Sequence, residues 1–347
     1  MYSFDSSKFF VIIKITIFAP VIFPSHKKYL LLMSSRLKGV LCGVGAAVSY
    51  GMNPLGALPL YSYGINTNSV LFYRYGLAVI LLGIFMAMGR KSFSITLKEF
   101  AVLVPLGILF ALSSLTLFAS FHFMDAGVAS TLLFVYPVMV AVIMAMFFKE
   151  RITFVTVVSI LLSLSGIALL YRGGDGGVLN TTGVLLVMLS SLTYALYIVV
   201  VNKSSLRMSS VKLTFYVLLV GVLLILSCSL LGSNESKIQL LTTPGMWLHA
   251  SILAVFPTIV SLLLMVVAVH EIGSTPTAVL GALEPLTAVI LGVTLFGERL
   301  TVGLSVGIML ILSAVVLIVL GNSISLNRIT MVAGRFGHLL AKPWRWK

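Results

Sequence analysis

Ten long apolar stretches follow one another along the chain, and they constrain its fold more than any other feature. They cover residues 39–60, 69–89, 100–122, 127–148, 153–171, 183–201, 211–231, 247–269, 276–297 and 301–321. A helix needs about 20 residues to cross the hydrocarbon core of a bilayer. Runs that are continuous rather than alternating favour helices over a β-barrel. The sequence therefore predicts an all-α integral membrane protein with ten transmembrane helices.

The composition excludes an ordinary soluble protein. Of the 347 residues, 59% are hydrophobic and 9% are charged, and the mean hydropathy is +1.14. A soluble domain carries about 25% charged residues. The net charge of +14 comes from short loops between apolar runs, so it indicates membrane orientation rather than nucleic-acid binding. Cys42 and Cys228 lie inside apolar runs without a Cys or His cluster, so we expect no metal and no cofactor.

The distribution of basic residues predicts the orientation. If the first helix starts in the cytoplasm, the inside segments hold nineteen of the Lys and Arg residues and the outside loops hold three, with Arg74 inside a run. Cytoplasmic loops are the ones that collect Lys and Arg. We therefore expect a plasma (inner) membrane protein with both termini in the cytoplasm.

The chain also contains an internal repeat. FFKERIT at 147–153 matches LFGERLT at 295–301 with an offset of 148, and the same offset matches His122 with His270. An offset of 144 matches GVL at 39–41 with GVL at 183–185. An ordered set of matches indicates duplicated structure. Because each unit has five helices, the second enters the membrane from the opposite side, an arrangement typical of secondary transporters.

The repeated segments resemble a known family. ASTLLFVYPVMVAVIMAMFFKERIT (129–153) and TAVLGALEPLTAVILGVTLFGERLT (277–301) are similar to the EamA family of the drug/metabolite transporter superfamily, and FYRYG (72–76) resembles its second-helix arginine. The resemblance covers about 36–321. It implies ten helices in two five-helix halves and the export or exchange of small metabolites, and it leaves the substrate open.

These observations divide the chain into five parts. We expect a first five-helix repeat at 36–171, a connector at 172–182 and a second, inverted repeat at 183–321. Residues 1–35 form an amino-terminal extension, which is either an over-long reading frame with Met33 as the natural start or an interfacial arm. The basic tail at 322–347 is either solvated or bound to the anionic cytoplasmic leaflet.

Two ionisable residues lie inside apolar runs. Glu284 is about ten residues into the ninth run, where an unpaired carboxylate costs at least about 2.5–3.5 kcal/mol. We interpret it as a cavity-lining group that holds a substrate amine or a proton, with a satisfied neutral carboxyl as the alternative. Arg74 either attracts a substrate carboxylate or snorkels to the outer headgroups.

Further residues complete the candidate site. The polar-tipped residues that we expect to line a substrate pocket, or else to form ordinary interhelical hydrogen bonds, are Tyr50, Asn53, Tyr136, Tyr194, Tyr197, Ser113 and Ser114. Pro137 and Pro285 remove a backbone donor in mid-helix and free the carbonyls of Leu133 and Gly281, so they predict hinges or static kinks.

The charged turns of the repeat have a structural interpretation. We expect Glu150, Arg151, Glu298 and Arg299 to fix the helix hairpins through carboxylate–guanidinium contacts, with gating as the alternative. No HExxH motif and no pair of intramembrane aspartates is present, so the chain is not expected to be an enzyme. The sequence favours a secondary transporter of a small metabolite, with protons and a homodimer as open options. A channel or a structural membrane component is the alternative.

Overall fold

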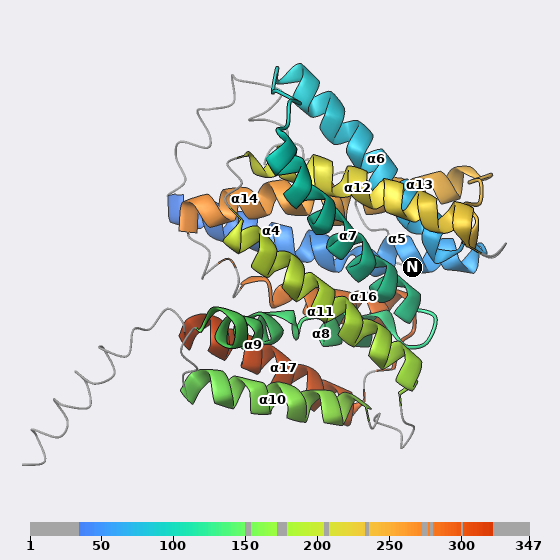
Figure 1. Cartoon of the computed structure of the whole chain (residues 1–347). Helices are drawn as coiled ribbons and strands as arrows, with labels where there is room; N and C mark the ends of the chain where they lie inside the picture. Colours follow the sequence, from blue (N-terminus) through green and yellow to red (C-terminus); the bar gives the residue numbers. More distant parts are fainter. Residues whose placement is uncertain are drawn as a thin grey trace, which may run out of the picture.

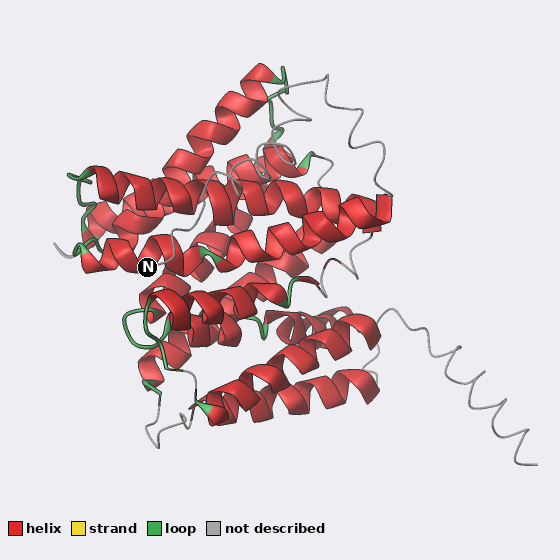
Figure 2. Ribbon diagram, turned by 180° about the vertical axis from the view of Figure 1, so that it is seen from behind, coloured by secondary structure: helices red, strands yellow, loops and turns green. Residues whose placement is uncertain are grey.

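The computed structural model describes residues 35–149, 154–171, 179–204, 208–232, 236–272, 277, 280–299 and 301–321. Within these ranges the regular structure is helical (Figure 2). The predictions for Glu150, Arg151, residues 1–34 and the basic tail concern residues outside the described part.

The helices follow the predicted apolar runs. The first half contains α4 (Ser35–Gly51), α5 (Asn53–Ser62), α6 (Thr67–Met88), α7 (Leu97–Ser120), α8 (Ala126–Leu133), α9 (Tyr136–Phe148) and α10 (Phe154–Tyr171). The second half contains α11 (Thr181–Lys203), α12 (Ser210–Leu231), α13 (Pro244–Ala254), the π-helical turn η4 (Val255–Val260), α14 (Ser261–Ile272), α16 (Leu283–Leu295) and α17 (Val302–Gly321).

Six helical segments of the described part are long and apolar enough to cross a membrane. They are Thr67–Met88, Leu97–Ser120, Ala126–Phe148, Thr181–Val201, Ser210–Leu231 and Pro244–Ile272. Shorter apolar helices cover Phe154–Leu169, Leu283–Leu295 and Val302–Leu317. The protein is therefore an all-helical membrane protein, but length alone does not give the predicted ten spans. One reason is that the first run is interrupted at Met52, so neither α4 nor α5 is long enough by itself.

Hydrogen-bonded side chains mark where several helices begin. Asn66 Oδ1 accepts from Ser69 N at 2.8 Å before α6, and Thr96 forms a reciprocal capping box with Glu99 before α7. Asn180 caps α11 in the same way. Such caps satisfy amide groups that have no partner within the helix.

The contacts between the two halves occur in matched pairs. The start of α4, at Gly39, packs against Glu271 and Ile272 at the end of α14, while the start of α11, at Gly183, packs against Phe123 and Met124 after α7. The sequence offsets relate the two contacts, since 39 + 144 gives 183 and 271 − 148 gives 123. The internal repeat therefore also appears in the packing.

A second matched pair of contacts joins a loop of each half to a helix of the other half, and the two contacts lie at opposite ends of the bundle. The Tyr73 hydroxyl on α6 donates to Gln239 O at 3.2 Å, and the Tyr216 hydroxyl on α12 donates to Phe93 O. The two tyrosines are 143 residues apart. Each half thus holds the loop that precedes the third helix of the other half.

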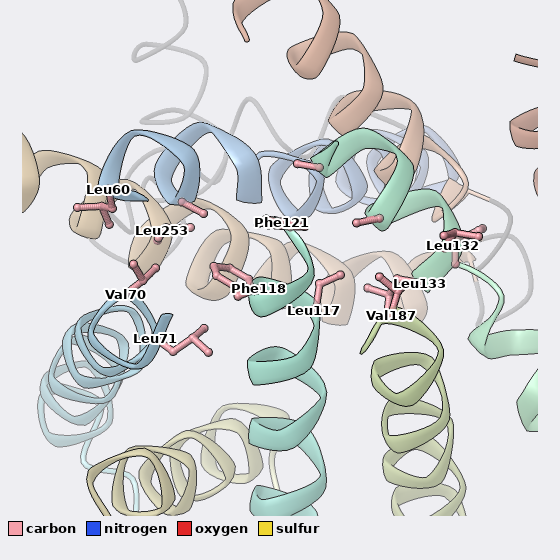
Figure 3. Packing of buried hydrophobic residues seen from close by; sticks show 14 of the residues in the cluster. Leu60, Val70, Leu71, Leu117, Phe118, Phe121, Leu132, Leu133, Val187 and Leu253 are labelled. Atoms are coloured by element: carbon pink, nitrogen blue, oxygen red, sulfur yellow. The ribbon is translucent and has the colours of Figure 1, made fainter. Parts of the chain in front are cut away.

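The bundle has one continuous core, which extends to the outer helices α10 and α17. Apolar side chains from α5, α6, α7, α8, α11 and α13 form one buried cluster, shown in Figure 3 with Leu60, Leu71, Phe118 and Leu132 among its members. At one edge, α10 and α17 lie side by side (Figure 1). The core therefore links both halves around the middle of the molecule.

The fourth apolar run forms two helices, which are separated just before its proline. Helix α8 ends at Leu133 and α9 begins at Tyr136, so Pro137 occupies the first turn of a new helix. The Ser191 hydroxyl of α11 donates to the freed Leu133 carbonyl at 3.1 Å. In the ninth run, Glu284 N donates to the Gly281 carbonyl at 3.0 Å. Both carbonyls that the prolines were predicted to free are therefore satisfied.

The Ser191 contact leads to a stability prediction. Ser191→Ala leaves the Leu133 carbonyl without this donor at the helix break, which we expect to lower the free energy of unfolding by about 1–3 kcal/mol. Thermal unfolding of the detergent-solubilised protein measures the change. Thr193→Val is the matched control on the same helix, because Thr193 Oγ1 donates only to the Leu189 and Ser190 carbonyls of its own helix. An equal loss in both variants would contradict this role of Ser191.

Candidate functional site

Arg74 lies in the interior of the bundle rather than at the headgroups. Its side chain is 2% exposed, and its Nε donates to Thr258 Oγ1 at 3.0 Å. The guanidinium carbon is 5.2 Å from the centre of the Phe118 ring, within cation–π range. This burial places a positive charge among aromatic rings.

The acceptor for Arg74 is Thr258, which the sequence analysis did not single out as a site residue. Thr258 lies in η4, the π-helical turn around Pro257 that separates α13 from α14, and its Oγ1 donates to Leu253 O at 3.0 Å. Single π-helical turns within α-helices often occur at functional sites. The signal that could have revealed it is Pro257 followed by a hydroxyl residue in an apolar run.

Glu284 is in the first turn of α16, immediately after the break in the ninth run. Its carboxyl group interacts electrostatically with Arg74 and with the hydroxyl groups of Tyr50 and Tyr136. Arg74 and Glu284 do not form an ion pair within 4.0 Å; among the described residues, Lys38 and Glu271 do, at 2.7 Å. The acid and the base therefore face one region without direct contact.

Four tyrosines surround this region, and the rings of three of them are in contact. The rings of Tyr136 and Tyr194 are edge-to-face at 4.7 Å, and those of Tyr194 and Tyr197 are parallel at 5.8 Å. Tyr50 joins the group through its interactions with Arg74 and Glu284. The structure thus brings together residues from five separate apolar runs: Tyr50, Arg74, Tyr136, Tyr194, Tyr197 and Glu284.

The remaining polar candidates differ in their roles. Ser113 Oγ is 3.0 Å from Ser190 Oγ, and Ser190 Oγ donates to Ser113 O at 2.7 Å, so these residues join α7 to α11. Ser114 accepts from the Tyr75 hydroxyl, beside Arg74. Ser113 therefore has the interhelical role that was its alternative interpretation.

Asn53 is a buried polar residue with unused hydrogen-bonding capacity. It is the first residue of α5, is 4% exposed, and its Oδ1 has no hydrogen-bond partner in the described structure. A buried carbonyl oxygen without a donor is unfavourable. Asn53 is thus available to accept a hydrogen bond from a ligand.

Pro137 and Pro285 have a different position from the one that the sequence suggested. They lie in the first turns of α9 and α16, after interruptions of the helical structure, rather than within continuous helices. A proline is tolerated in the first turn, where its missing N–H is not needed. Each candidate hinge is thus the break that precedes its proline.

The hydrogen-bond partners of Glu298 differ from those that were expected. Its carboxylate accepts from the backbone amides of Ala126 (2.8 Å) and Gly127 (3.2 Å) at the start of α8, instead of pairing with a guanidinium. Burial raises the pKa of Glu298, and the nearby Asp125 raises it further, while the two amides lower it. Arg299, beside it, is exposed. The turn therefore binds a helix start in the other half.

A small cavity lies away from this polar group. It measures about 30 Å³, the space of one water molecule, and is lined by Leu82, Ser210, Val211, Thr214, Ile259, Leu262, Leu263 and Val266. Its apolar lining and size do not suit a metabolite. In the described part of the chain, no three His, Cys, Asp or Glu side chains are grouped to hold a metal ion.

The contact between Arg74 and Thr258 can be tested by stability. Thr258→Val removes the acceptor and leaves a buried charged donor unpaired, which we expect to destabilise the protein by about 1.5–3 kcal/mol. Thr258→Ser keeps the hydroxyl and should unfold close to the parent temperature. Thermal unfolding in detergent compares the two variants, and equal destabilisation by both would show that the methyl group, not the hydrogen bond, is responsible.

Comparisons with known proteins find proteins named as transporters. An uncharacterized transporter of Archaeoglobus fulgidus is 26% identical over 256 residues, which are 73% of this chain and 87% of that protein. The uncharacterized transporter YvbV of Bacillus subtilis is 26% identical over 219 residues, 62% of this chain and 71% of its own. A crystal structure with 17% identity superposes with a TM-score of 0.58, covers 81% of this chain and 96% of its own, and supports the fold.

The family comparison covers most of the chain and does so twice. The model of the EamA-like transporter family matches residues 37–172 and again residues 181–320. The two matches coincide closely with the two sets of helices that repeat each other's contacts. This chain belongs to the EamA-like transporter family.

Proposed function

We propose that the protein is a secondary transporter that exports or exchanges a small metabolite, such as an amino acid or a drug-like compound. The observation that carries the proposal is the polar group in the middle of the bundle. The first half contributes Tyr50, Arg74 and Tyr136, and the second contributes Tyr194, Tyr197 and Glu284. One buried positive group, one acid and several aromatic rings suit a small ligand with both polar and apolar parts.

The surroundings of this group support a binding role. Tyr50, Tyr136, Tyr194, Tyr197 and Glu284 all keep part of their surface accessible, although they face one another inside the bundle. Breaks in α4–α5, α8–α9 and the ninth run lie close to Tyr50, Tyr136 and Glu284. In secondary transporters, interrupted helices commonly form the substrate site.

Two halves of opposite sense provide the mechanism. We take 36–171 and 183–321 as five-helix units that cross the membrane in opposite directions, giving ten spans with both termini in the cytoplasm. The matched contacts of Gly39 and Gly183 support this arrangement, because each half packs on the other in the same way. Exchange of conformation between such halves would expose one central site alternately to each side.

The functional experiment compares the medium of cells that overproduce the protein with that of cells that overproduce Glu284→Gln. Metabolite profiling by mass spectrometry should show at least one compound that accumulates about tenfold less with the variant, because the amide cannot bind an amine or proton as the acid does. Equal expression of the two proteins must be verified by immunoblot.

Glu99→Gln is the matched control for this experiment. Glu99 is an exposed acid in the capping box of α7 and lies outside the central group, so its loss should leave the medium unchanged. A profile that is the same for the parent and Glu284→Gln would remove Glu284 from the site. Counterflow of the identified compound would separate a carrier from a channel, since only a carrier shows trans-stimulation.

A further inference from the structure

We propose that Glu298 is a latch that holds the α8 end of the transport pathway closed. The inference rests on the proposed transport function, and it assigns to one turn of the repeat the control of access to the central site. The orientation predicted from the basic residues places this end on the outer side of the membrane.

The latch is a pair of hydrogen bonds between the two halves. Glu298 follows α16, and its two carboxylate oxygens accept from the Ala126 and Gly127 amides at 2.8 and 3.2 Å, across 172 and 171 positions of sequence. A carboxylate at a helix start is favoured both by the free N–H groups and by the helix dipole. The contact is therefore specific to an acid with two acceptor oxygens.

The surrounding backbone leaves room only for this carboxylate. A methyl group added at Gly127 would lie 2.9 Å from Glu298 Oε2 and 2.9 Å from Val289 Cα. One added at Gly292 would lie 1.9 Å from the same oxygen. Two glycines on the facing helices α8 and α16 thus allow the close approach that the latch requires.

The two helices that the latch joins both lead to the central group. Helix α8 runs from the latched amides to the break before Tyr136, and α16 runs from Glu284 to the turn that carries Glu298. At 1.5 Å per residue, α16 is about 20 Å long. Fixing the outer ends of these two half-helices therefore restrains α8, whose inner end precedes Tyr136, and α16, whose inner end carries Glu284.

The latch can open because a second acid lies at the same helix start and can accept a hydrogen bond there. Asp125 is in the N-cap position of α8, where aspartate usually accepts from the first amides, yet it makes no side-chain cap. Glu298 occupies those donors instead. When Glu298 withdraws, Asp125 can cap α8 by accepting from the Gly127 amide, so this donor has an acceptor in both states.

The test measures access to the centre without requiring a known substrate. Ser114→Cys serves as reporter in a protein whose Cys42 and Cys228 are replaced by Ala, and a charged, membrane-impermeant methanethiosulfonate reagent is added to right-side-out or inside-out vesicles. In right-side-out vesicles, Glu298→Gln should raise the labelling rate about tenfold, as expected when a charge-assisted hydrogen bond is lost from the closed state alone. Gly127→Ala, which forces the contact apart from the other side, should do the same.

Arg299→Gln is the matched control and should label like the parent reporter, because the exposed Arg299 is the neighbour of Glu298 on the same turn. Rates within twofold of the parent for both Glu298→Gln and Gly127→Ala, or an increase confined to inside-out vesicles, would overturn the latch. A changed labelling rate without metabolite export would leave the latch intact and contradict the transport proposal. Metabolite export together with an unchanged labelling rate would support the transport proposal and contradict the latch.

Discussion

The requirement that every backbone polar group has a hydrogen-bond partner in hydrocarbon governs this structure. Helices meet it along their length, but a break in mid-membrane exposes carbonyl and amide groups that water cannot reach. Here specific groups cover the exposed backbone at two breaks and at one helix start. Ser191 donates to Leu133 O, Thr258 donates to Leu253 O, and Glu298 accepts from the start of α8. In two of these three cases the hydrogen-bond partner comes from the other half of the molecule.

The same breaks position the polar group at the centre. Residues next to broken helices are the ones that meet there: Tyr50 near the end of α4, Tyr136 at the start of α9 and Glu284 at the start of α16. The π-helical turn adds Thr258, which holds Arg74. A substrate site built at interruptions can change shape by moving half-helices, whereas continuous helices would have to slide as whole bodies.

The sequence was informative about the helices and less so about the site. Apolar runs and offsets of 144 and 148 gave the helix positions and the repeat, because a bilayer requires long apolar helices and duplication preserves contact residues. The partners of individual residues could not be obtained in this way. The sequence favours an interhelical hydrogen bond for Ser113 over a substrate role, but it cannot identify Ser190 as the partner. For Glu298 the sequence suggests an arginine partner because of charge, whereas the backbone amides that it binds are present at almost every residue and give no sequence signal. Among the described helices, six segments are long enough to span a membrane, compared with the ten that were predicted. One reason is that a break divides the first run.

The central claim is that two halves of opposite sense surround one site, and the sidedness of their equivalent turns tests it most directly. Lys149 ends the fourth helix of the first half, and Arg299 lies in the corresponding turn of the second; both are exposed. Each is replaced by cysteine in a protein without Cys42 and Cys228, and an impermeant maleimide is added to intact cells. The account predicts that position 299 is labelled from outside and position 149 only after the membrane is permeabilised. Labelling of both positions from the same side would contradict it.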